Sequence, residues 1–203
     1  MSIPFQDSET AKNLLRAFAG ESQARNRYDF AANLCQKQEL QAMAFIFQAT
    51  AKQEQAHAKV FWDHLQALNG QNLPIYGAYP IEGTNRILEL LRAAQHNEHE
   101  EHGSVYPSFA AIATQEGIPE AAASFRQIAA IEQLHGERFG LLADQLESGA
   151  LFVSQIETGW MCLNCGHTQN SLEAPKQCPV CNHGQGWFIR LELAPWSPVV
   201  KQT

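Results

Sequence analysis

Glutamate and histidine residues recur along the first two thirds of this sequence at a spacing that suits metal binding. One lone glutamate is followed by three pairs whose members are three residues apart: Glu21, Glu54 and His57, Glu98 and Glu101, and Glu132 and His135. Residues three apart on an α-helix project from one face about a turn apart, so four helices could direct these side chains to a common centre. Carboxylates and imidazoles are ligands for transition metals. The pattern predicts a site for two metal ions, with all seven residues as candidate ligands.

The candidate ligands lie on the apolar stripes of predicted helices. Between about Ser8 and Glu147, apolar residues recur at spacings of three and four, which predicts four amphipathic helices. The four stripes, each with its candidate ligands in place, are Leu14, Phe18, Glu21, Ala24, Tyr28, Ala31 and Cys35; Phe47, Ala51, Glu54, His57, Phe61, Leu65 and Leu68; Ile87, Leu91, Ala94, Glu98, Glu101 and Val105; and Phe125, Ile128, Glu132, His135, Phe139, Leu142 and Leu146. A four-helix bundle with charged residues in its core is therefore expected.

The connection between the second and third helices is unusually long. From Asn69 to Gly83 the sequence contains three glycines and two prolines, and such a segment can run the length of a bundle at up to ~3.3 Å per residue. A long crossover at this position is typical of ferritin-like bundles. Pro107 is expected to kink the third helix just beyond the site, because it cannot donate a hydrogen bond to the carbonyl of Gly103.

Five carboxylates in one helical core are costly to bury unless cations neutralise them. Each loses its hydration, and their mutual repulsion adds to the cost. Two Fe²⁺ ions would supply four positive charges against five negative ones. The alternative is a solvated acidic face with charge pairs along each helix, but it disagrees with the position of these residues on the apolar stripes.

The remaining histidines and the lone cysteine are weaker candidates. At 100° per residue, His96 and His99 point away from the face that carries the third glutamate pair, and only His102 lies near that face as a candidate partner of a ligand. Cys35 lies about 21 Å along the first helix from Glu21, so we expect it to be a buried, unreactive thiol.

Four of the five cysteines form two Cys-x-x-Cys pairs near the C-terminus. Cys162 and Cys165 are separated by twelve residues from Cys178 and Cys181. Two such pairs make a tetrahedral four-sulfur site for one metal ion. A zinc ribbon uses the same spacing, so the cysteines alone indicate a metal without distinguishing iron from zinc.

The residues around the cysteine pairs predict a second, small domain. Gly166 and Asn182 each follow a pair, where a left-handed backbone lets amide groups point at the thiolates. The β-prone stretches and the aromatic residues expected to form a minimal core are Leu151–Ile156, Gly186–Leu193, Trp160, Trp187 and Phe188. We expect a helical domain over residues 1–149 and a small β-rich domain that holds the cysteine pairs over residues 150–203.

Composition excludes several classes of partner. The 203 residues carry a net charge of -7 and contain no run rich in lysine and arginine, which argues against a nucleic-acid partner. No apolar run approaches the roughly 20 residues of a membrane helix, and Met1–Ala11 has no signal-peptide core. The cysteine pairs are typical of a metal site in a reducing compartment. We expect a cytoplasmic protein without a membrane partner.

Together these motifs resemble the rubrerythrin family, in which a ferritin-like di-iron domain is fused to a rubredoxin-like domain. The resemblance covers almost the whole chain. It rests on Gly20-Glu21-Ser22-Gln23-Ala24-Arg25 ahead of Tyr28, on Glu54-x-x-His57, on Glu98-x-x-Glu101 leading to Tyr106-Pro107-x-Phe109-Ala110, on Glu132-x-x-His135 and on the two cysteine pairs.

The resemblance implies an activity and its cofactors. The seven glutamates and histidines would hold two irons, and the four cysteines would hold one rubredoxin-type iron. Such a protein would reduce hydrogen peroxide to water in defence against oxidative stress. Its electrons would enter at the cysteine-bound iron, from rubredoxin or an NAD(P)H-dependent reductase.

The resemblance also implies roles for single residues and an assembly. Tyr28 and Tyr106 match tyrosines that hydrogen-bond to ligand carboxylates. Glu101 and His57 match the two ligands between which one iron moves as its redox state changes. Members of the family are commonly homodimers in which the rubredoxin iron of one subunit lies nearer the di-iron site of the other. At least a homodimer is therefore expected.

Two other functions are compatible with parts of the sequence. A ferroxidase or iron-handling protein would use oxygen or peroxide to oxidise Fe²⁺, but iron storage needs no electron-entry module. A non-enzymatic scaffold with zinc in the cysteine pairs would gain nothing from five carboxylates in its core. The C-terminal extension Ala194–Thr203 carries no motif that we can assign.

Overall fold

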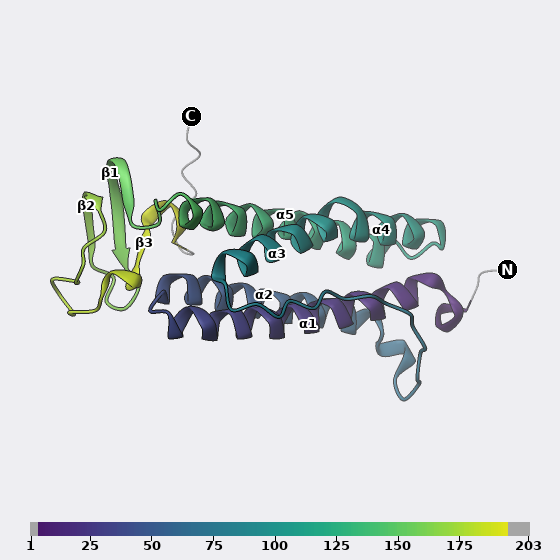
Figure 1. Cartoon of the computed structure of the whole chain (residues 1–203). Coiled ribbons are helices and arrows are strands. Elements are labelled where there is room, and N and C mark those ends of the chain that lie inside the picture. Colours follow the sequence, from purple (N-terminus) through teal and green to yellow (C-terminus); the bar gives the residue numbers. More distant parts are fainter. Residues whose placement is uncertain (1–3, 195–203) are drawn as a thin grey trace.

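The structure is a computed structural model that describes residues 4–194, so all of the C-terminal extension except Ala194 lies outside the described residues. Its larger part is a helical bundle. The helices are α1 (Glu9–Lys37), α2 (Gln41–His64), α3 (Ile87–Glu100), α4 (Tyr106–Gln115) and α5 (Pro119–Glu147). In Figure 1, α1 and α2 form one layer, and α3, α4 and α5 form the layer above it. Because α4 continues α3, the described residues build four helical rods, and the predicted ferritin-like bundle is confirmed.

The long crossover joins the two layers. After α2 and a short 3₁₀ turn, η2 (Gln66–Leu68), residues 69–86 form no helix or strand. In Figure 1 this segment runs back beside α1 to the start of α3. The predicted connection between the second and third helices therefore has the expected position. At the other end of the bundle, Gly117 adopts a φ of +76° and Pro119 opens α5, so the turn between α4 and α5 is short.

The third rod differs from the prediction. The expected kink beyond the site is instead a π-helical turn, η3 (Glu101–Val105), which begins at a candidate ligand. Pro107 has no N–H for the carbonyl of Gly103. The wider π turn absorbs this mismatch, and α4 then continues as regular helix. Turns of this kind are frequent at functional sites.

Two apolar clusters occupy the bundle, and the candidate ligands lie between them along the helices. The cluster nearer the sheet contains Tyr28, Phe47 and Phe139, whose rings lie 5.0–5.9 Å apart. The other contains Phe61, Tyr106 and Phe125, whose rings lie 5.1–6.0 Å apart. Close-packed aromatic rings on both sides fix the helices that carry the ligands.

The C-terminal part is a small antiparallel sheet in the order β2-β1-β3. Its strands are β1 (Val153–Cys162), β2 (Thr168–Glu173) and β3 (Phe188–Arg190). The predicted aromatic core is confirmed for Trp160 and Phe188, which are fully buried with two of the cysteines, whereas Trp187 is partly buried at its edge. Strand β2 was not predicted, because its polar residues become a strand only by pairing with β1.

The sheet module rests on one end of the bundle, beside the loop between α1 and α2 (Figure 1). Gly186 lies so close to the carbonyl of Glu39 that any side chain there would clash with the backbone. Ile189 and Ala194 are buried in the bundle's own apolar cluster. The two parts therefore share a packed interface. Within residues 4–194, none of the helices combines the length and apolarity needed to span a lipid bilayer.

Candidate metal centres

Six of the seven predicted side chains converge in the middle of the bundle as two overlapping groups. In each group, the ligand atoms of four residues all lie within 4.8 Å of one another. The first group is Glu21, Glu54, His57 and Glu132, and the second is Glu54, Glu98, Glu132 and His135. None of the six is more than 6 % exposed. Since Glu54 and Glu132 belong to both groups, the arrangement provides two adjacent sites with two shared carboxylates.

Each unshared glutamate accepts a hydrogen bond from a buried tyrosine. Tyr106 Oη donates to Glu21 Oε1 at 2.5 Å, and Tyr28 Oη donates to Glu98 Oε1. The tyrosine of α4 thus contacts a glutamate of α1, while the tyrosine of α1 contacts a glutamate of α3. These bonds orient each carboxylate and leave its second oxygen facing the centre of the site.

Both imidazoles direct Nδ1 into the site. His57 Nδ1 lies 2.9 Å from Glu54 Oε2 and from Glu132 Oε1, and His135 Nδ1 lies 2.8 Å from Glu132 Oε2. On the far side of its ring, His135 Nε2 donates to Gln53 Oε1 at 2.9 Å. Because an amide oxygen only accepts, this bond keeps a proton on Nε2 and leaves Nδ1 for a metal ion. Sequence reasoning missed Gln53, since a glutamine beside a ligand carries no distinguishing pattern.

Glu101 is the one predicted ligand that belongs to neither group. It stands at the start of η3, three residues after Glu98. Its side chain is half-buried and lines a cavity of about 280 Å³ between α1, the crossover and the third rod. Six of the candidate ligands therefore form two matching groups, whereas Glu101 has no counterpart on the other side of the site.

Burial has a large effect on the carboxylates in the metal-free chain. Burial raises the pKa of Glu21 to about 8, although the nearby imidazole of His57 opposes the change. Burial likewise raises the pKa of Glu98, and burial together with the neighbouring carboxylates raises the pKa of Glu101. The site thus retains protons at neutral pH unless other cations replace them.

The pKa values of both imidazoles are raised, although burial alone would lower them. Burial disfavours the charged ring, but hydrogen bonds to Glu132 and Glu54 outweigh it and raise the pKa of His135 to about 12. Glu132 and Glu21 likewise raise the pKa of His57, again against the effect of burial. Two imidazolium rings therefore supply the positive charge that metal ions would bring. Metal binding must release these protons.

Unpaired atoms test whether metal ions fit this site. The buried ligand atoms that have only other ligand atoms of the site as neighbours, and no hydrogen-bond partner outside it, are Glu21 Oε2, Glu54 Oε1, Glu98 Oε2, both carboxylate oxygens of Glu132, and His135 Nδ1. Buried polar atoms are costly when they are unpaired, and all of these belong to the two four-residue groups. Oxygen-rich groups with one imidazole each suit iron. The residues present therefore fit a di-iron centre.

The weaker candidates lie elsewhere. His96 and His99 are exposed, as expected. His102 Nδ1 lies 2.8 Å from the carbonyl oxygen of Ala129 on α5, so this ring contacts the backbone and no candidate ligand. Cys35 is fully buried, and burial raises the pKa of its thiol to about 12, which confirms an unreactive side chain.

The four C-terminal cysteines form one compact group. Cys162 Sγ lies 3.7 Å from Cys181 Sγ, and Cys165 Sγ lies 3.6 Å from Cys178 Sγ. A tetrahedron with metal–sulfur bonds of about 2.3 Å has edges of about 3.8 Å. The sulfur positions therefore fit a single tetrahedral metal ion.

Backbone geometry prepares the cysteine group for a metal. Gly166 and Asn182 adopt φ values of +77° and +60°, which confirms the predicted left-handed turns. The backbone N–H of His183 donates to the Cys181 thiolate and lowers the pKa of that thiol to about 5. Local turns rather than distant helices thus create this site.

Comparisons with known proteins agree with both centres. The rubrerythrin family model matches residues 12–143, and the model for the rubrerythrin rubredoxin-like domain matches residues 160–189. The chain is 43 % identical to rubrerythrin from Porphyromonas gingivalis over 93 % of this chain and 92 % of the relative. It is 40 % identical to rubrerythrin from Nitratidesulfovibrio vulgaris over 92 % of this chain and 96 % of the relative.

Solved structures show the same fold. Partially reduced nigerythrin superimposes with a TM-score of 0.61 and 24 % identity, covering 91 % of this chain and 90 % of the other. Reduced symerythrin from Cyanophora paradoxa superimposes with a TM-score of 0.58 and 17 % identity, covering 72 % of this chain and 89 % of the other. The chain therefore belongs to the rubrerythrin family and carries both its di-iron domain and its rubredoxin-like domain.

Proposed function

We propose that this protein is a peroxidase that reduces hydrogen peroxide to water at the di-iron centre, with electrons entering through the cysteine-bound iron. The observation that carries the proposal is the presence of two different centres in one chain. A buried carboxylate and histidine site alone would also suit iron oxidation for storage. A four-cysteine module packed on the same bundle is useful only where the di-iron centre must be reduced repeatedly.

We assign the ligands as follows. Glu54 and Glu132 would contact both ions of the di-iron centre, and the unshared pairs of the two groups would each contact one ion. The four cysteines would hold one iron. Glu101 lies at the edge of the site while His57 belongs to one of the two groups, which supports an exchange of these two residues as ligands of one ion. A domain boundary between residues 149 and 150 is supported by Gly149, whose φ of +70° follows the end of α5.

Conversion of one peroxide to two waters requires two electrons and two protons. The di-iron centre, when bound, supplies the two electrons that break the O–O bond. Glu101 can hold a proton on its carboxyl group and pass it to a departing oxygen, because the side chain lies between the site and a cavity. The tyrosine bonds to Glu21 and Glu98 keep these carboxylates oriented while charge changes nearby.

The choice of oxidant tests this function. Fully reduced protein would be mixed without air with either hydrogen peroxide or oxygen, and the consumption of each oxidant would be followed. The proposal predicts that peroxide is consumed much faster than oxygen and that two electrons are used for each peroxide. Faster consumption of oxygen would instead identify a ferroxidase.

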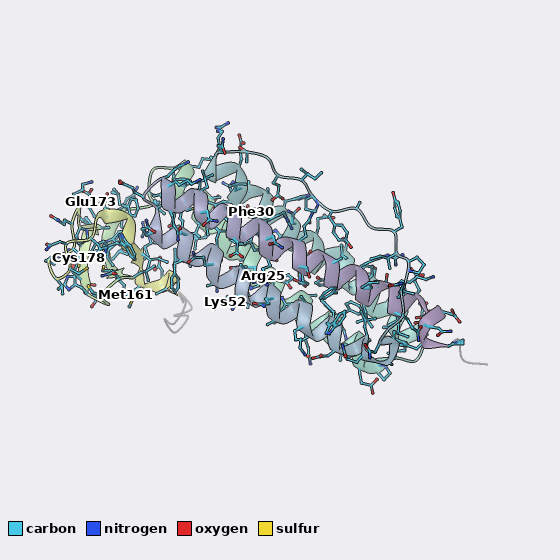
Figure 2. All side chains as sticks on the ribbon, turned by 90° about the horizontal axis from the view of Figure 1, so that it is seen from below. Arg25, Phe30, Lys52, Met161, Glu173 and Cys178 are labelled. Atoms are coloured by element: carbon cyan, nitrogen blue, oxygen red, sulfur yellow. The ribbon has the colours of Figure 1, made fainter. Side chains whose placement is uncertain are left out.

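Electron delivery is proposed to occur between subunits of a homodimer. The module of this chain touches the bundle near Glu39 and Leu40, whereas Glu54 lies roughly 21 Å further along α2. In Figure 2, Cys178 and Met161 lie at one end of the molecule, whereas Arg25 and Lys52 lie along the bundle. Electron transfer weakens steeply with distance, so the module of a second copy is the better donor. Rubredoxin or an NAD(P)H-dependent reductase would supply electrons to the module. The five free cysteines are consistent with a reducing cytoplasm.

A groove on the outer face of α1 and α2 supports this arrangement. It has a volume of about 740 Å³ and includes Gln55, Ala56 and Ala58, which flank the ligands of α2. Its rim carries Arg25 and Lys52, which lie side by side in Figure 2 on a chain whose net charge is -7. Four thiolates around one iron carry a net negative charge. The groove is therefore complementary to the cysteine module of a second copy.

Mixed dimers test the route between subunits. Glu101→Ala should disable the di-iron centre, and Cys162→Ser should disable the module. Each variant alone is expected to lack sustained turnover. If electrons cross between subunits, exchange between the two variants restores activity, because one intact module then faces one intact di-iron centre. No recovery in a mixture shown to contain mixed dimers would contradict this route.

A further inference from the structure

A cavity beside the di-iron site has walls from three separate elements. It has a volume of about 280 Å³ and lies between α1, the crossover and the third rod. Since one water occupies about 30 Å³ of liquid, the space suits a few small molecules. Glu101 and Tyr106 line it, so its inner wall is part of the site. The groove outside α1 and α2, in contrast, is lined by none of the seven candidate ligands.

Two polar side chains in the cavity wall have unused hydrogen-bonding capacity. Gln23 Oε1 is buried without a partner among the described residues, while its Nε2 donates to Pro80 O at 3.2 Å. Arg27 Nε is also buried without a partner, while its Nη1 contacts Glu82 Oε1 at 2.9 Å. Both side chains belong to the cavity wall, but these two atoms are themselves almost without accessible surface. The cavity wall is therefore polar on this side, as suits the passage of a small polar molecule.

The crossover forms the outer wall and is held in place by α1. Tyr79 Oη donates to Arg16 O at 3.0 Å, and Arg16 Nε donates to Tyr76 O at 2.9 Å. The Tyr79 ring lies opposite Gly20, where a Cβ atom would be 3.6 Å from Tyr79 Cε1. Gly20 immediately precedes the candidate ligand Glu21 in the sequence. Because glycine has no side chain, the cavity stays open beneath the Tyr79 ring.

We propose that this cavity is the entrance through which hydrogen peroxide reaches the di-iron site, and that Tyr79 limits entry to small hydroperoxides. The inference rests on the proposed peroxidase function and adds its substrate route and a specificity-determining residue. Gln23 and Arg27 would form part of the polar wall along which peroxide passes from the crossover to Glu101. The aromatic wall would exclude hydroperoxides with bulky organic groups.

Blocking the cavity tests the route. Gly20→Leu would fill the space beneath Tyr79, whereas Gly20→Ala places only a methyl group in ordinary contact with the ring. In the iron-loaded, reduced protein, Gly20→Leu should slow both peroxide consumption and the binding of nitric oxide, a small neutral probe for ferrous iron, by about tenfold. Gly20→Ala should slow both much less. Equal rates in the two variants, or slower peroxide consumption with unchanged nitric oxide binding, would overturn the proposal.

Opening the cavity tests the role of Tyr79 without altering a helix of the bundle. Tyr79→Ala should raise the rate with cumene hydroperoxide, relative to the rate with hydrogen peroxide, by about tenfold. Ile81→Ala is the matched control, because Ile81 is on the same crossover, is 95 % exposed and does not line the cavity. An unchanged ratio in Tyr79→Ala would remove Tyr79 as the determinant of size. If the wild-type protein consumes no peroxide, nitric oxide binding in the Gly20 variants still decides whether the cavity is the route.

Discussion

The bundle and the cysteine module solve the problem of binding metal in opposite ways. In the bundle, the ligands come from four long rods, are almost fully buried and, when no metal is present, have charged atoms whose only partners are one another. In the module, the ligands come from two short turns, Cys165 is exposed, and backbone amides already stabilise a thiolate at Cys181.

This difference supports the proposal that the buried centre reacts with peroxide and the exposed centre receives electrons from the donor. Burial excludes bulk water and strengthens electrostatic interactions, as bond breaking requires. Exposure at the edge of a small sheet lets a partner approach the iron closely, as electron transfer requires. A buried carboxylate site also adjusts by exchanging protons and ligands, while a tetrahedral thiolate site keeps one geometry.

The largest effect is expected from disabling the module while the bundle stays intact. Cys162→Ser should lower sustained peroxide turnover by at least about 100-fold. Loss of a residue that only supports a metal ligand already costs up to about 100-fold, and Cys162 is itself a candidate ligand. In a single turnover, the reduced variant should react with peroxide as fast as the reduced wild-type protein does. Stopped-flow and steady-state assays on the same sample separate the two. Cys35→Ala is the control, since this buried thiol touches neither centre, and undiminished steady-state turnover in Cys162→Ser would rule out the relay.

The next largest effect is expected at the asymmetric residue of the bundle. Glu101→Ala should lower the rate of the reduced protein with peroxide by about 10²-fold, within the range for loss of a proton-transfer group. The fold should persist, because Glu101 is outside both four-residue groups. Circular dichroism and iron content check this point. Glu137→Ala, at an exposed position of α5, should react normally, and a Glu101 variant as fast as wild type would remove this residue from the mechanism.

The two centres should also respond differently to pH when metal is absent. The pKa of Glu21 is raised to about 8 from an ordinary value of 4.5, so the folded bundle binds more protons than the unfolded chain between these values. Its stability should therefore fall as pH rises from about 5 to 8, and the raised pKa of His135 extends the loss to higher pH. The lowered pKa of Cys181 has the opposite sign and favours the folded module as pH rises from about 5 to 9.

Thermal unfolding of iron-free protein, followed by helical circular dichroism, measures this slope. Glu21→Gln should flatten it, and iron loading should stabilise the bundle most at the higher pH, because metal binding releases protons. An iron-free bundle that gains stability between pH 5 and pH 8 would show that the buried carboxylates are not the groups that dominate its titration.

The smallest effect is expected from the tyrosines that orient the bundle ligands. Tyr28→Phe removes the bond to Glu98 and should lower the free energy of unfolding by about 1–2 kcal/mol. Tyr106→Phe should cost a similar amount through Glu21. Urea titrations of iron-loaded protein give both values. Strongly unequal losses would show that the two halves of the bundle site are less equivalent than their hydrogen bonds indicate.

Much of this architecture could be predicted because charged residues occupied apolar stripes. Glu54, His57, Glu132 and His135 lie where helical periodicity places them, inside the bundle. The left-handed turns at the cysteine pairs were likewise predictable from the identity of single residues.

The features that were missed depend on tertiary context. The π turn that begins at Glu101 precedes Pro107, which lacks an N–H for the helical ladder, and a helical wheel assumes that no such turn exists. Gln53 becomes important only when α2 and α5 pack side by side. The cavity under Tyr79 requires the path of the crossover, which no local periodicity encodes.

The central claim is that the bundle consumes peroxide and the module supplies its electrons. The most direct test mixes fully reduced, iron-loaded protein with stoichiometric hydrogen peroxide without air while the visible absorption of the ferric four-sulfur centre is followed. The account predicts that this colour returns as fast as peroxide disappears. Colour that returns far more slowly than peroxide disappears, or no colour at all because zinc occupies the cysteines, would contradict it.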